Sequence, residues 1–120
     1  MNKNTEINSY KDLDVWKQSM QLSKNVYRLA DELPPEEKYG LSSQLKRASV
    51  SIPSNIAEGS RRSSRDFRRF IKMALGSASE LETQLLLAEE LHGAEVRDSI
   101  ELLQDIHKML LALKGSLPDK

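Results

Sequence analysis

The stretch from Gln44 to Lys72 reads QLKRASVSIPSNIAEGSRRSSRDFRRFIK, and it predicts two helices joined by a short connection. Its first half places apolar residues three and four positions apart, which is typical of a helix with one buried face. Gly59 then interrupts the pattern, and Ser63 followed by Asp66 is a typical helix start in which serine caps the first turn. We therefore expect a helix on each side of Gly59, with Gly59 as the left-handed cap of the first.

The same stretch carries eight basic residues against two acidic ones, Glu58 and Asp66. The next stretch, residues 73–105, reverses the balance with eight acidic residues against Arg97 alone. A formal net charge of zero therefore conceals two patches of opposite sign. This asymmetry indicates either a charged partner or self-complementary assembly, and the sequence leaves both readings open.

The length of 120 residues corresponds to a single domain, residues 1–120, of which residues 1–8 are expected to be disordered. The absence of cysteine excludes disulfides, thiolate nucleophiles and cysteine-ligated metal sites. The N-terminal sequence lacks the apolar segment of a signal peptide, and no apolar run approaches the roughly 20 residues of a membrane-spanning helix. We therefore expect a soluble, cytoplasmic protein.

Two predicted helices precede Gly59. Ser9 with Asp12 is a start signal for the first, which should run to about Glu32, before Pro34 and Pro35. Its buried face consists of Val15, Leu22, Val26, Leu29 and Leu33. The buried stripe of the second helix consists of Leu41, Leu45, Ala48, Ile52 and Ile56. Pro53 lies inside this second helix and should kink it, with Asn55 satisfying the freed backbone groups and Glu58 pairing with Arg61 or Arg62.

Two further helices follow Gly59. The third should end at Gly93, with a core seam of Phe67, Phe70, Ala74, Ala78, Leu81, Leu85, Ala88 and Leu91. A second apolar stripe, Ile71, Leu75 and Leu86, lies near small residues around Gly76. We therefore expect Leu75, Gly76 and Leu86 to contact another subunit.

The fourth helix should begin near Ala94 and stop at Gly115, and its apolar positions are Val96, Ile100, Leu103, Ile106, Leu110, Leu113 and Leu117. Four helices with short connections predict an all-α, antiparallel up-down-up-down four-helix bundle.

Four strings make the chain resemble a known family: DLxVWK at 12–17, YGLxxQL at 39–45, SIPSNIAEG at 51–59 and ALGSxxELETQL at 74–85. It is identified as a member of the four-helix-bundle family named for 23S ribosomal RNA intervening-sequence proteins. The resemblance covers residues 10–92. It implies a bacterial, cytoplasmic protein that assembles into a ring, usually a homopentamer, with no enzymatic activity and no cofactor. Distant relatives assist reverse transcriptases of diversity-generating retroelements by binding nucleic acid, which makes RNA and a partner protein of this kind candidate partners.

The arginine cluster is the clearest functional signal in the sequence. Arginine suits phosphate because its planar guanidinium donates two parallel hydrogen bonds and stays charged. The candidate nucleic-acid-binding residues are Arg61, Arg62, Arg65, Arg68, Arg69 and Lys72, with Lys46 and Arg47 as an outer set. The alternative is a structural or protein-interaction ring in which this basic face meets the acidic half of a neighbouring subunit.

Metal binding and catalysis have weaker support. Glu89 and His92 have the spacing of half a di-iron carboxylate site, but the second histidine, His107, lacks the matching glutamate. The serines have no evident base partner in the sequence. We therefore expect no metal site, no catalytic residues and no enzymatic activity.

Overall fold

The computed structural model describes residues 9–119, and within them the chain forms four α-helices and no strand. The α-helices are α1 (Asp14–Asp31), α2 (Leu41–Ser60), α3 (Ser64–His92) and α4 (Arg97–Ser116). Two short 3-10 turns, η1 (Tyr10–Asp12) and η2 (Pro35–Glu37), precede α1 and α2. The all-α prediction is confirmed, whereas the expected disorder of residues 1–8 lies outside the described part.

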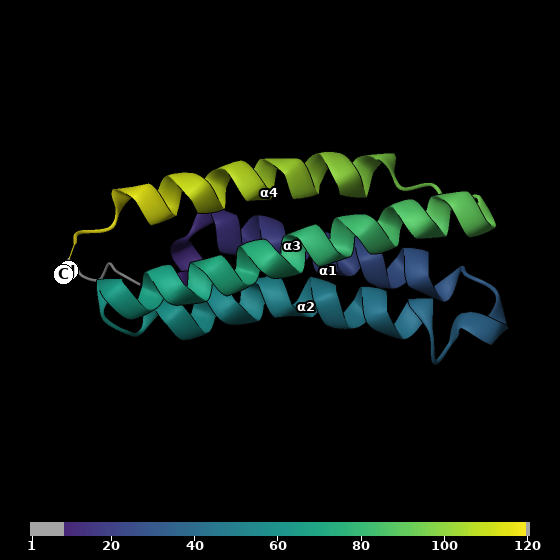
Figure 1. The fold of residues 1–120 in the computed structure, drawn as a ribbon, viewed down its shortest axis with the longest axis horizontal. Coiled ribbons are helices and arrows are strands. Elements are labelled where there is room, and N and C mark those ends of the chain that lie inside the picture. Colours follow the sequence, from purple (N-terminus) through teal and green to yellow (C-terminus); the bar gives the residue numbers. More distant parts are fainter. Residues whose placement is uncertain (1–8, 120) are drawn as a thin grey trace.

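The helices pack side by side into an elongated body of 49 × 29 × 23 Å. α2 contacts both α1 and α3, and α4 contacts both α3 and α1. In Figure 1 the α2–α3 connection lies at the same end as the C-terminus, and the α1–α2 and α3–α4 connections lie at the opposite end. The basic end of α3 and the acidic end of the same helix are therefore separated along the long axis.

The core consists mainly of the apolar positions that the spacing predicts. Leu22, Leu45, Ile52, Leu81 and Leu85 are fully buried between the helices. Some positions differ from the expectation, among them Leu41, which is only half-buried. Leu91 is 64% exposed, because it lies in the last turn of α3 beyond most of the packing. Ile71 is fully buried in the subunit core, so it is not part of an outward stripe, and Phe70 is only half-buried.

Gly59 does not cap α2, so the predicted left-handed cap is wrong. It lies inside the helix, and among the glycines of the described residues only Gly93, with φ 68°, has positive φ. A Cβ on Gly59 would lie 2.6 Å from Cβ of Phe70 and 2.9 Å from Cδ1 of Phe67. Glycine is required there because α3 crosses α2 at that point, not because of backbone strain.

Helix ends match the sequence signals in part. Ser63 caps α3 by accepting a hydrogen bond from the Asp66 amide, and Gly93 ends that helix, both as predicted. Ser9 caps only η1, accepting from the Lys11 amide, and α1 starts later at Asp14. α4 begins at Arg97 instead of near Ala94 and runs through Gly115 to Ser116.

α2 continues through Pro53, which has no N–H for the Ser49 carbonyl. The hydroxyl of Ser23 on α1 donates to that carbonyl at 2.9 Å. The prediction that Asn55 satisfies the freed group is wrong, because its amide nitrogen donates to the Ser51 carbonyl, one turn back, at 2.8 Å. Pro53 therefore couples α2 to α1 through a hydrogen bond between helices.

Candidate nucleic-acid interface

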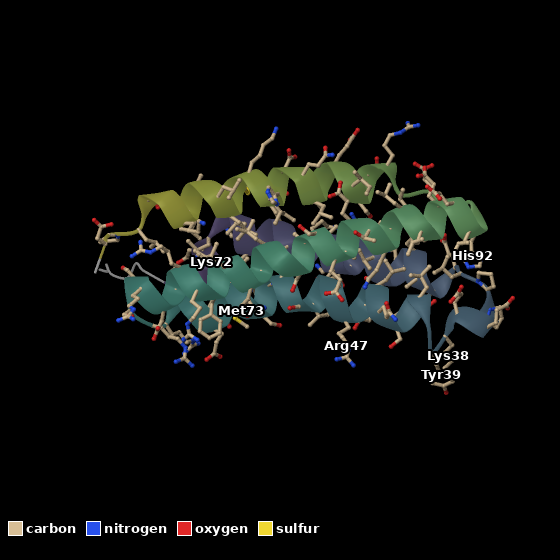
Figure 2. The ribbon with its side chains drawn as sticks, viewed as in Figure 1. Lys38, Tyr39, Arg47, Lys72, Met73 and His92 are labelled. Atoms are coloured by element: carbon tan, nitrogen blue, oxygen red, sulfur yellow. The ribbon has the colours of Figure 1, made fainter. Side chains whose placement is uncertain are left out.

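The arginine cluster lies at one end of the molecule, where α2 ends and α3 begins. Arg61 and Arg62 form the connection, and Arg65, Arg68 and Arg69 occupy the first turns of α3. Lys72 follows one turn later and is exposed; Figure 2 labels it in this half of the molecule. The structure therefore brings the six inner candidate residues together. The Ser63 hydroxyl caps the first turn of α3, the helix that carries Arg65, Arg68, Arg69 and Lys72.

Two of the arginines are paired with neighbouring carboxylates. Arg62 donates to Glu58, one turn earlier, as expected, and this hydrogen bond raises the pKa of Arg62 above its ordinary value. Arg69 donates to Asp66 over 3.4 Å, a long contact that is exposed to solvent. Exposed pairs of this kind contribute little stability, so both guanidiniums can exchange a carboxylate for a phosphate at small cost.

Aromatic rings support three of the guanidiniums. The Arg61 guanidinium lies 5.4 Å from the Tyr10 ring centroid. Arg62 and Arg69 lie 5.1 and 5.4 Å from the centroid of the half-buried Phe70 ring. A cation held against a ring face has fewer conformations to lose when it binds an anion.

Arg68 makes a hydrogen bond within the subunit. Its guanidinium donates to the Leu117 carbonyl at 3.1 Å and thereby ties the end of α4 to the start of α3. The side chain is partly buried at this contact. Arg68 therefore supplies positive charge to the cluster but is less available to a ligand than its neighbours.

A surface hollow of about 640 Å³ opens on the cluster. It is lined by Ser63, Arg65, Asp66, Arg68, Arg69 and Lys72, four basic side chains against one acidic. Within residues 9–119, Arg65 and Lys72 form no ion pair. Of the four basic side chains that line the hollow, these two are therefore the most available to an anionic ligand.

The outer candidates Lys46 and Arg47 are not part of this hollow. Lys46 pairs with Asp31 of α1 at 2.8 Å and lies over the Tyr27 ring. Arg47 is exposed on α2, 14 residues before Arg61, which places it roughly 20 Å away along the helix. Figure 2 shows Arg47 and Lys72 well separated along the long axis.

The three predicted subunit-contact residues have different environments. Leu75 is half-buried and packs against the core. Gly76 is exposed, with open space where a Cβ would lie, and Leu86 is 44% exposed. Gly76 and Leu86 are therefore accessible to a partner, whereas most of Leu75 is engaged within the subunit.

The histidine of the Glu89/His92 pattern has another partner. His92 Nε2 lies 2.8 Å from Glu37 Oε2 on η2, at the end of the molecule opposite the arginine cluster, where Figure 2 labels it. Residues 9–119 contain no group of three or more His, Asp or Glu side chains that could hold a metal ion. In the same part of the chain, no helix combines the length and hydropathy needed to cross a bilayer.

The sequence did not predict the contact between the SIPSNIAEG string of α2 (residues 51–59) and the ALGSxxELETQL string of α3 (residues 74–85). The hydroxyls of Ser51 on α2 and Ser77 on α3 lie 2.8 Å apart, and Asn55 donates to Ser51 Oγ at 3.0 Å. Two turns farther along α3, Gln84 is buried and its Oε1 has no hydrogen-bond partner within the described residues. The signal was the density of small and polar residues in both strings, which permits close helix approach.

Comparison with known proteins places this geometry in context. Residues 11–115 match the model of the 23S rRNA-intervening sequence protein family. The chain belongs to this family. A crystal structure of a protein of unknown function from the S23 ribosomal protein family of Bacteroides thetaiotaomicron VPI-5482 has the same fold, with a TM-score of 0.77. That protein is 22% identical, and the alignment covers 85% of this chain and 99% of the other. No curated protein matches the chain.

Proposed function

We propose that this member of the 23S rRNA-intervening sequence family is a non-enzymatic, cytoplasmic RNA-binding protein that contacts phosphates through its arginine cluster. For the subunit we propose an up-down-up-down antiparallel bundle, and for the assembly a closed homo-oligomeric ring, a pentamer by resemblance. The observation that carries the proposal is the hollow at the start of α3, with four basic side chains against one acidic. The availability of Arg65 and Lys72 supports it further.

Phosphate contacts fit this site better than base-specific readout. The cluster presents guanidinium and ammonium donors, and Phe70, its nearest aromatic ring, is already covered by Arg62 and Arg69. Backbone contacts position a protein on nucleic acid without reading its sequence. Repetition of the cluster on each subunit of a ring would raise avidity for a polyanion without any new contact.

The experiment is purification at low salt, followed by titration of a structured RNA at several salt concentrations. Nucleic acid should accompany the protein at low salt. The logarithm of affinity should fall linearly with the logarithm of salt concentration, with a slope of about −0.7 to −0.9 per neutralised phosphate. Weak binding that does not depend on salt would contradict phosphate recognition.

A second candidate is a structural or protein-interaction ring with no nucleic-acid binding, in which the partner can be a protein such as a reverse transcriptase. It is favoured by the acidic half of α3 and the start of α4, which match the basic cluster in number of charges. On this reading, reversal of charges in the cluster breaks the ring, and the wild-type protein binds no RNA even at low salt.

A further inference from the structure

A largely apolar groove between α1 and α2 has a volume of about 650 Å³. Its apolar and aromatic lining comes from Tyr10 of η1 and from Trp16, Met20, Tyr27, Val50, Pro53 and Ala57. Met20, Tyr27 and Val50 are 37%, 42% and 40% exposed although they are large and apolar. From Trp16 to Tyr27 the groove follows α1 for roughly 17 Å, about three turns of a helix.

The charged residues of this groove are all basic. Lys24 and Arg28 line it, and of the residues that line it none is acidic. Both side chains are exposed, and the Arg28 guanidinium contacts only the neutral Asn25 side chain, at 3.3 Å. A complementary occupant would therefore be apolar at its centre and acidic at its edges.

This chain carries such a surface on the second half of α3. Leu87 and Leu91 are one helical turn apart and are 43% and 64% exposed. Glu80 and Glu90, both exposed, flank them on the same side of the helix away from the core. The Leu87/Leu91 ridge is therefore apolar at its centre and acidic at its edges, which complements the apolar floor and basic edges of the groove.

We infer that the α1–α2 groove binds the Leu87/Leu91 ridge of a second copy of this chain, with Lys24 and Arg28 facing Glu80 and Glu90. This inference rests on the proposed ring assembly and names its contact surfaces. Groove and ridge lie on different helices, so each subunit uses one surface toward each neighbour. Such a head-to-tail contact generates a ring when the rotation closes.

The arrangement also accounts for both charge patches. The acidic half of α3 meets the basic edges of the groove, and the arginine cluster takes no part in the contact. Arg65 and Lys72 then remain accessible on every subunit. Assembly and nucleic-acid binding thus use separate basic surfaces.

The test is a pair of charge reversals followed by measurement of mass in solution. Lys24→Glu/Arg28→Glu should raise the dissociation constant of the assembly by at least about tenfold, because it opposes Glu80 and Glu90 with like charges. Adding Glu80→Lys/Glu90→Lys to the same chain should restore assembly. The matched control, Lys17→Glu/Lys108→Glu, reverses two exposed basic residues outside the groove and the arginine cluster and should assemble normally.

The four substituted side chains of the groove and control variants are exposed, as are Glu80 and Glu90 of the ridge. Circular dichroism checks that helicity is retained. Groove variants should keep RNA binding per subunit, because Lys24 and Arg28 lie outside the arginine cluster. If the wild-type protein forms a ring and the Lys24→Glu/Arg28→Glu variant assembles equally tightly, the inferred contact is wrong and the proposed ring still holds. A wild-type monomer at tens of micromolar would overturn both the inference and the proposed ring.

Discussion

Gly59 on α2 and Phe70 on α3 are so close that a Cβ added to the glycine would lie 2.6 Å from the phenylalanine Cβ. No adjustment of a flexible side-chain end can relieve this contact, because both atoms are fixed to their backbones. The two helices must separate locally if the glycine is replaced. This crossing also positions the start of α3, and with it Arg62, Arg69 and the hollow of the arginine cluster.

Gly59→Ala should therefore lower the free energy of unfolding by about 1–3 kcal/mol, the usual cost of overpacking. The control is Gly76→Ala, also within a helix but with open space at the Cβ position. Because alanine favours helix over glycine, that change should stabilise the protein by about 0.5–1 kcal/mol. Denaturant unfolding of both variants measures the difference, and a stabilised Gly59→Ala variant would rule out the close crossing.

Ser23→Ala should destabilise the protein through the carbonyl of Ser49. The Ser23 hydroxyl donates to that carbonyl at 2.9 Å, and Pro53 supplies no amide to replace it. Leaving the buried acceptor unpaired should cost about 1–3 kcal/mol, whereas Ser43→Ala, at an exposed position, should cost much less. In a Pro53→Ala background the amide is restored, so the penalty of Ser23→Ala should shrink. Equal penalties in both backgrounds would argue against this pairing.

Acid should destabilise the end of the molecule that holds His92. Glu37 Oε2 contacts His92 Nε2, and Glu37 Oε1 accepts from the Leu41 amide at the start of α2. These hydrogen bonds, that of His92 first, hold the pKa of Glu37 below its ordinary value of 4.5. The stabilisation is complete above pH 4.5 and is lost as pH falls through the lowered pKa in the folded state.

Melting temperatures measured from pH 6 down to about pH 3 test this linkage. Glu37→Gln should be less stable than wild type at pH 6 and should approach it at the acid end, where the wild-type carboxylate is protonated. Glu36→Gln is the matched control at an exposed neighbouring position. Parallel pH curves for wild type and Glu37→Gln would mean that the Glu37 carboxylate does not stabilise the folded state.

The sequence was sufficient for features that depend on neighbours in the chain. Helical spacing predicts the buried residues of α1, α2 and α4, and the Ser63 and Gly93 signals each act within a few residues of themselves. Gly59 was misread because a glycine at a predicted helix end and a glycine at a helix crossing look alike in sequence. Ile71 and Leu91 were misplaced for a related reason, since their burial depends on which helices lie beside α3.

In the candidate site too, the sequence predicts contacts between residues that are close in the chain and does not predict contacts between distant ones. The clustering of Arg61 to Lys72 follows from adjacency on one helix start. The carboxylate partners of Arg62 and Arg69 lie within four residues and could be anticipated, whereas the contact of Arg68 with Leu117 spans 49 residues. The same applies to Lys46, which is paired with Asp31 of another helix. Only the folded chain shows that Arg65 and Lys72, of the four basic side chains lining the hollow, form neither an ion pair nor the carbonyl contact of Arg68 within residues 9–119.

The central claim is that the arginine cluster binds phosphate and does not hold the assembly together. Its most direct test is the affinity of Arg65→Glu/Lys72→Glu for a structured RNA at low salt, measured together with the mass of the assembly. Both residues are exposed and unpaired within residues 9–119, so the fold should be retained. We expect affinity to fall at least about tenfold, with a shallower salt dependence and an unchanged mass. Unchanged RNA affinity, or a dissociated assembly, would contradict the account.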